Sequence, residues 1–99
     1  MKEVKSMKQV YPTFIAQCED DFLVYVPDMD IYTQGESVAD AIKMARDAIG
    51  LKGVDLEDDG KQLPDPSNYQ QAMAKAKMDA DEDFDYTEGI LTMVDIDFT

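Results

Sequence analysis

The sequence has no histidine and no tryptophan, and its one cysteine is Cys18. Histidine is the commonest general base and transition-metal ligand, so a Ser-His-Asp or Cys-His triad cannot form within this chain. A zinc site needs nitrogen or sulfur ligands, and Cys18 alone can neither build one nor pair in an internal disulfide. The glycine-rich nucleotide-binding patterns are also absent. We therefore expect no catalytic residues, no metal and no cofactor.

Basic residues are scarce. Nine lysines and arginines stand against 22 aspartates and glutamates, which gives a net charge of −13. Phosphate binding depends on clustered lysine and arginine, so we expect no direct nucleic-acid binding and no attraction to an anionic membrane. The charge instead favours a basic protein partner, drawn in by long-range attraction. The alternative is that the acidity only keeps a small protein in solution.

Long apolar runs are missing as well. No segment approaches the roughly 20 apolar residues that span a bilayer, and residues 1–6 lack the apolar stretch of a secretory signal. We therefore expect a cytoplasmic protein without membrane contact. With 99 residues, 44% of them hydrophobic, the chain suits a single domain over residues 1–99 with its core at about 9–98.

The first third of the chain is rich in residues that favour β-structure. β-branched and aromatic residues over 9–26 suit a pleated sheet, and the acidic break at 19–21 predicts a hairpin turn between two strands. Pro12 cannot donate a ladder hydrogen bond, so it should lie at a strand start or on an unpaired side. A short third strand at 31–34 is closed by Gly35.

A helical period follows from Val38. Ser37 precedes it as a candidate N-cap, with Asp40 three residues on. Gly50 and Gly53 weaken the end of this helix. The apolar positions recur with the spacing of one helix face: Val38, Ala41, Ile42, Ala45, Ala48 and Ile49.

A second helix is predicted through residues 70–77, after a loop at 55–67 that is rich in acids and proline. Ser67 or Asn68 can cap it. Its apolar face is mostly alanine and methionine, so we expect it to pack weakly or to lie against a partner. A last strand then alternates with period two, with a more apolar face formed by Ile90, Val94, Ile96 and Phe98.

These elements give the order β-β-β-α-α-β, an α+β fold. A chain that leaves a three-stranded meander through helices usually returns to the same sheet, and a parallel return beside the first strand requires a right-handed crossover. We therefore predict a four-stranded mixed sheet with the helices on one face.

Carboxylates are the remaining candidates for chemistry. Residues 55–60 have the spacing of the start of an EF-hand calcium loop, but Pro66 occupies the twelfth position, where a bidentate glutamate belongs. A two-metal nuclease needs carboxylates that converge on two ions. Here Glu19 lies at the far end of the first strand, and Asp95 and Asp97 on the last strand are expected to face solvent. Calcium binding and nuclease activity are therefore minor alternatives.

Several segments carry a resemblance to a known family: 11–15, 22–28, 33–37, 41–48, 59–67 and 94–97. In this order and spacing, they resemble HicB-type antitoxins of bacterial toxin–antitoxin pairs. The resemblance extends from about Tyr11 to Phe98. Its most specific part is the set formed by 27–28, 33–35 and 63–67. The chain departs from the family at 29–32, where a small glycine-containing turn is usual.

The resemblance implies a partial ribonuclease H-like fold that has lost catalysis. It also implies a role as antitoxin, which binds a small basic HicA-like toxin and masks its mRNA-cleaving surface. Many family members carry a C-terminal DNA-binding segment. Because this sequence stops at Thr99, directly after the last predicted strand, we expect no such domain in this chain. The alternative is a solitary HicB-like regulatory or ligand-binding module without a toxin partner.

For the partner-binding residues, we choose acids and an exposed aromatic on the turns and the sheet edge: Asp20, Asp21, Asp28, Asp30 and Tyr32. The alternative for each is an ordinary solvated loop residue. A homodimer is also expected, because such sheets have open edges that need covering. Leu91 and Met93 would suit self-association if their sheet face were exposed.

Overall fold

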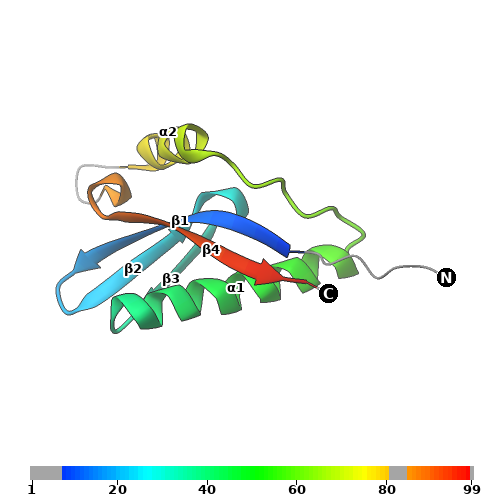
Figure 1. Cartoon of the computed structure of the whole chain (residues 1–99), viewed down its shortest axis with the longest axis horizontal. Helices are drawn as coiled ribbons and strands as arrows, with labels where there is room; N and C mark the ends of the chain where they lie inside the picture. Colours follow the sequence, from blue (N-terminus) through cyan, green and yellow to red (C-terminus); the bar gives the residue numbers. More distant parts are fainter. Residues whose placement is uncertain (1–7, 81–84, 99) are drawn as a thin grey trace.

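The computed structural model describes residues 8–80 and 85–98 (Figure 1). Two short 3-10 turns, η1 and η2, accompany the helices and strands. None of the helices in these residues is long and apolar enough to cross a membrane. The elements are β1 (Lys8–Cys18), β2 (Asp21–Val26), η1 (Pro27–Met29), β3 (Ile31–Gly35), α1 (Val38–Asp58), α2 (Tyr69–Asp79), η2 (Tyr86–Glu88) and β4 (Ile90–Asp97).

The four strands form one sheet in the order β3-β2-β1-β4. The hairpin predicted at 19–21 is confirmed, because β1 and β2 pair from Phe14 opposite Tyr25 to Cys18 opposite Asp21. Pairing with β2 begins only at Phe14, so at Pro12 the strand has a neighbour on the β4 side alone. This agrees with the unpaired side expected for the proline.

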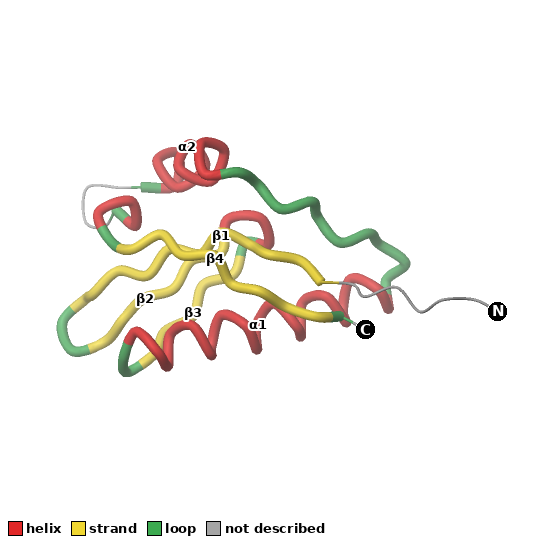
Figure 2. Tube along the Cα trace, viewed as in Figure 1, coloured by secondary structure: helices red, strands yellow, loops and turns green. Residues whose placement is uncertain are grey.

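The predicted mixed sheet is wrong, because β4 runs antiparallel to β1, as do all the other neighbouring pairs. With 21 residues, α1 is about 30 Å long and carries the chain to the end of the sheet where β1 begins. α2 then returns toward the hairpin end (Figure 2). β4 therefore enters beside Ile15 and runs back along β1. The α+β class and the element order are confirmed, whereas the ribonuclease H-like description stays a prediction.

The prediction that both helices cover one face is also wrong. α1 packs against one face of the sheet and α2 against the other (Figure 1). The segment between them changes sides, and the Tyr11 hydroxyl holds it by donating to the Pro64 carbonyl oxygen at 2.8 Å. The sheet alternates by residue, so each face needs its own apolar cover. Phe14 and Tyr25 supply the α2 side, whereas Tyr11, Ile15 and Val24 supply the α1 side.

α1 continues past the glycines that were predicted to weaken its end. Gly53 is buried because the Phe98 ring lies against it, so close that an added Cβ atom would lie 2.3 Å from a ring carbon. α1 continues through residues 55–58, which were predicted to begin a loop. The EF-hand alternative requires a loop that starts at residue 55, so it does not fit this structure. Small helix residues here let β4 approach α1 closely.

Both predicted helix starts are confirmed. The Ser37 hydroxyl accepts a hydrogen bond from the Asp40 amide at 3.0 Å. Asn68 and Gln71 form a reciprocal capping box, at 2.8 and 3.0 Å. Such caps satisfy amides that the first helical turn leaves without partners.

Candidate functional site: an acidic and tyrosine-rich surface

The acids predicted to bind a partner fall into two groups at opposite ends of β2. Asp20 and Asp21 are exposed at the β1–β2 turn. Asp28 and Asp30 lie beyond the other end of β2, in and after η1. β2 has six residues and spans about 20 Å. The five predicted residues therefore do not form a single cluster.

Asp28 makes its contacts within the molecule. Its side chain is only 2% exposed and lies 3.4 Å from the Lys75 ammonium group. The Ser67 amide donates to Asp28 Oδ2 at 2.7 Å, and the Ser67 hydroxyl donates to Oδ1. These bonds attach the start of α2 to η1. Asp28 remains a prediction as a partner contact, but its carboxylate is already occupied by α2.

Asp30 is exposed and has a left-handed backbone, with φ of 51°. Aspartate tolerates this region better than most residues. Asp30 helps to line a hollow of about 230 Å³ together with Tyr25, Met78 and Asp79. The end of α2 thus brings Asp79 to the same place as Asp30, although 49 positions separate them in the sequence.

A stack of three tyrosines lies beside this hollow. Tyr25 and Tyr32 are opposite each other in the β2–β3 ladder, and their rings stack with centroids 4.9 Å apart at an interplanar angle of 18°. The Tyr86 ring from η2 tilts against both, at 5.1 Å from Tyr25 and 6.4 Å from Tyr32. Tyr25 is buried, whereas 59% of Tyr32 is exposed. The Tyr32 ring is therefore exposed to solvent, and the neighbouring tyrosine rings hold it in place.

The same surroundings raise the pKa of the buried Tyr25 and of the half-buried Tyr86. Burial raises the pKa of Tyr25, and its hydroxyl donates to Asp79 Oδ2, which raises the pKa further. Burial also raises the pKa of Tyr86, with additional contributions from Tyr32 and Cys18. At neutral pH, Asp79 is thus tied to a neutral phenol. The surface combines the Asp79 carboxylate with tyrosine rings, and the cationic side chain of Lys75 lines the same hollow.

Sequence reasoning missed Tyr25, Met78, Asp79 and Tyr86 as members of this surface. The pairing of Tyr25 with Tyr32 could have been found, because a tight β2–β3 connection fixes which residues lie opposite each other. No comparable signal exists for Asp79 and Tyr86. They lie on α2 and η2, which cover the sheet face that the predicted fold left uncovered.

The acids of the minor nuclease alternative do not converge on a common point. Arg46 Nη2 pairs with Asp95 Oδ1 at 2.9 Å, and this contact lowers the pKa of Asp95. Across residues 8–80 and 85–98, no three side chains of the His, Cys, Asp and Glu types are grouped as a metal site requires. The described elements form a small α+β domain.

The sequence matches one family model, that of the HicB_like antitoxin of bacterial toxin-antitoxin system, over residues 11–99. The chain belongs to this family, which confirms the resemblance and supports an antitoxin role. Membership of an antitoxin family also suggests a non-enzymatic role. Among curated proteins, none matches the chain.

Solved structures agree with the fold. A toxin–antitoxin complex from Streptococcus pneumoniae contains a chain with 26% identity and a TM-score of 0.75, and the match covers 93% of this chain and 71% of that one. A chain of the HicA3 and HicB3 toxin–antitoxin complex has 28% identity and a TM-score of 0.66, covering 90% and 99%. The antitoxin HicB of Burkholderia pseudomallei shares the fold at 22% identity and a TM-score of 0.68, and the match covers 92% of this chain and 64% of that antitoxin.

Proposed function

We propose that this protein is the antitoxin of a toxin–antitoxin pair, which binds a small basic HicA-like toxin in the cytoplasm and masks its mRNA-cleaving surface. Family membership supports the antitoxin role. The single structural observation that carries the proposal is the exposed Tyr32 ring, stacked on Tyr25 beside Asp30 and Asp79.

This surface has the features that make a protein interface stable. Exposed tyrosines act as binding hot spots because they bury a large area at little cost in conformational entropy. The net charge of −13 speeds the encounter with a basic partner, and salt weakens this attraction. Aspartates at the contact occupy positions where an RNA-cleaving protein binds phosphates. Inhibition therefore requires no chemistry from the antitoxin.

The test is to co-express the chain with a small basic protein encoded next to it and to measure the affinity of the purified pair. We expect a stable complex, and we expect Tyr32→Ala to weaken it roughly thirtyfold, which corresponds to a hot spot of about 2 kcal/mol. Tyr69 is a matched control, since it is also 59% exposed but lies at the start of α2. Tyr69→Ala should bind like wild type.

Two results would contradict the proposal. The first is the absence of a complex with the neighbouring basic protein when both are folded. The second is a complex that Tyr32→Ala and Tyr69→Ala weaken equally, because the tyrosine stack would then have no special part in binding.

A homodimer is a second, separate proposal. The outer edge of β4 is partly covered, because Arg46 Nε donates to the Asp95 carbonyl oxygen at 2.9 Å. Leu91 packs under α2, but Met93 on the same face is 48% exposed. We propose that copies associate through β3, the other edge strand. Light scattering should then give twice the monomer mass, and a monomer at all concentrations would refute this.

A further inference from the structure

Tyr32 presents its ring from β3, which is an edge strand of the sheet. Its side chain is 59% exposed, so contacts within β3 alone would leave it free to adopt several rotamers. A partner that binds a mobile side chain must freeze it, and this loss of freedom weakens the complex. The groups that restrict the Tyr32 ring before binding therefore matter for affinity.

Two rings restrict Tyr32 from different directions. The Tyr25 ring stacks on it from the paired position in β2, with centroids 4.9 Å apart. The Tyr86 ring meets it at 6.4 Å and an interplanar angle of 57°, within the range of distances at which aromatic pairs attract each other. Tyr25 belongs to the same sheet as Tyr32, whereas Tyr86 is brought to it by η2.

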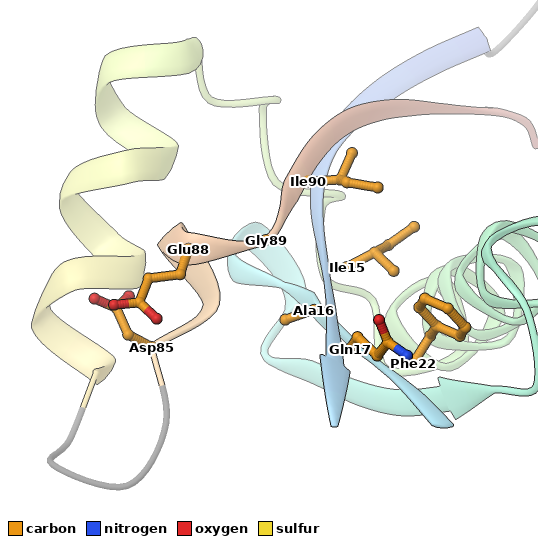
Figure 3. A pocket seen from close by; sticks show the side chains of 8 residues that line it. All are labelled: Ile15, Ala16, Gln17, Phe22, Asp85, Glu88, Gly89 and Ile90. Carbon is orange, nitrogen blue, oxygen red and sulfur yellow. The ribbon is translucent and has the colours of Figure 1, made fainter. Parts of the chain in front are cut away.

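η2 is held at both of its ends. At its start, Asp85 Oδ1 accepts hydrogen bonds from the Thr87 hydroxyl at 2.6 Å and from the Thr87 amide at 2.9 Å. At its end, Gly89 passes so close to β1 that an added Cβ atom would collide with the Ile15 carbonyl oxygen. Figure 3 shows this path, with the Asp85 side chain on the α2 side of the turn. The backbone that carries Tyr86 therefore has a fixed place beside the sheet.

α2 holds the other two rings of the stack. The Tyr25 hydroxyl donates to Oδ2 of Asp79, the last residue of α2. Tyr86 packs against the cluster that contains Ala72 and Ala76, the buried alanines of α2. The orientation of the exposed ring, the position of η2 and the packing of α2 are thus connected through ring contacts.

We propose that Tyr86 is a positioning residue, which fixes the Tyr32 ring in the orientation that the toxin binds. Its contribution to affinity passes through Tyr32 and needs no contact between Tyr86 and the toxin. The identity of the partner rests on the proposed function. Because a ring that is already ordered loses less freedom on binding, the stack strengthens the complex. Linkage makes the effect reciprocal, so toxin bound at Tyr32 stabilises the docked position of η2.

The first test needs no toxin. In the free full chain, the ring proton and carbon chemical shifts of Tyr32 should include a ring-current effect from Tyr86. Tyr86→Leu should move the Tyr32 signals toward those of an exposed tyrosine, whereas Tyr86→Phe, which keeps the ring, should preserve them. The Tyr69 signals, from the start of α2, are the internal control and should change in neither variant. Tyr32 signals that stayed in place in Tyr86→Leu would overturn the proposal.

The second test measures toxin affinity in a double-mutant cycle. Tyr86→Leu should weaken binding about tenfold, and Tyr86→Phe should stay within about twofold of wild type. In a Tyr32→Ala background, Tyr86→Leu should cause less than about a twofold further loss, because the ring that Tyr86 positions is gone. A direct contact with the toxin, or a general loss of stability, would act equally in both backgrounds. Equal losses would therefore overturn the proposal.

Hydrogen exchange provides a measurement that requires no Tyr86 variant. The Glu88 and Gly89 amides donate to the Asp85 and Tyr86 carbonyl oxygens, at 3.2 and 3.0 Å, so they exchange when η2 opens. Saturating toxin should slow their exchange in the wild-type chain, and this slowing should be lost in Tyr32→Ala. Exchange that toxin did not change, or equal slowing in both proteins, would overturn the coupling.

The outcomes separate this inference from the proposed function. If the toxin binds and Tyr86→Leu changes neither the Tyr32 signals nor the affinity, the positioning role is refuted and the antitoxin role stands. If no toxin binds but Tyr86→Leu displaces the Tyr32 signals, the antitoxin proposal fails and the ordering of Tyr32 by Tyr86 stands. If no toxin binds and the signals do not move, both proposals are refuted.

Discussion

Asp28 and Asp30 differ by two positions in the sequence and have opposite surroundings. The side chain of Asp28 is buried and bonded to Ser67 and Lys75, whereas Asp30 is exposed at the hollow beside Tyr25. The sequence offers no sign of this difference, because both aspartates belong to one short polar loop. It depends on α2 folding over that loop from 39 positions away along the chain.

Replacing each aspartate with asparagine provides a matched pair. Asp28→Asn removes the charge that Ser67 and Lys75 bond, so we expect a loss of about 2 kcal/mol in the free energy of unfolding. Asp30→Asn makes the same charge change at an exposed left-handed position that asparagine tolerates. It should change stability by less than about 0.5 kcal/mol. Urea denaturation followed by circular dichroism measures both, and equal effects would contradict the assigned roles.

Tyr25 makes the free energy of unfolding depend on pH in the alkaline range. Burial and the Asp79 contact raise its pKa in the folded state above the ordinary value of 10.0. Its contribution to stability is therefore complete below pH 10. Above pH 10 the unfolded chain releases this proton while the folded chain retains it, so the free energy of unfolding falls as pH rises.

Tyr25→Phe should remove part of this alkaline loss. Tyr11 and Tyr86 also have raised pKa values. The free energy of unfolding of the variant should therefore still fall with pH, but less steeply. Below pH 10 the variant should be about 1 kcal/mol less stable, because it lacks the hydrogen bond to Asp79. Urea denaturation between pH 8 and pH 11 provides the comparison. The same slope in both proteins would show that Tyr25 does not contribute.

At the scale of elements, local signals predicted the helix starts well and the first helix end poorly. Ser37 and Asn68 are N-caps because their side chains reach amides in the first turn, which a sequence pattern can reveal. Gly50 and Gly53 lie inside α1, where Gly53 faces the Phe98 ring just beyond β4 and Gly50 faces Ile96 of β4. These contacts join residues more than 40 positions apart, so local helix propensity could not reveal them.

Gly35 and Gly50 provide a contrast between two kinds of glycine. A Cβ atom at Gly35 would lie 2.5 Å from the Ala41 amide nitrogen, in backbone that cannot move aside. At Gly50 the nearest atom would be Ile96 Cδ1, at an ordinary 3.7 Å. We expect Gly35→Ala to destabilise the fold by about 2 kcal/mol and Gly50→Ala to stabilise it by about 0.5–1 kcal/mol. Shifts of the two melting temperatures in the same direction would contradict this.

At the scale of the whole molecule, the number, type and order of the elements could be predicted, but the path between the two helices could not. The short loops around β2 restrict β1–β3 to a meander. No comparable restriction acts on the segment at 59–68, which could remain on one face or pass to the other. It passes to the other face, so η2 brings Tyr86 to the tyrosine stack. On that face α2 returns the chain to the hairpin end, so β4 enters beside Ile15 and runs antiparallel to β1.

The charge of the whole molecule predicts how binding responds to salt. With a net charge of −13, association with a basic toxin should slow by about tenfold or more between low and physiological ionic strength. Dissociation should change much less, because contacts within the docked interface are screened less than distant charges. Stopped-flow mixing separates the two rates, and an association rate independent of salt would contradict electrostatic steering.

The measurement that tests the central claim most directly is RNA cleavage by the purified toxin during titration with this protein. We predict that wild type stops cleavage at a fixed molar ratio to the toxin, whereas Tyr32→Ala requires more than tenfold higher concentrations and Tyr69→Ala matches wild type. Cleavage that continued unchanged at saturating wild-type protein would contradict the account.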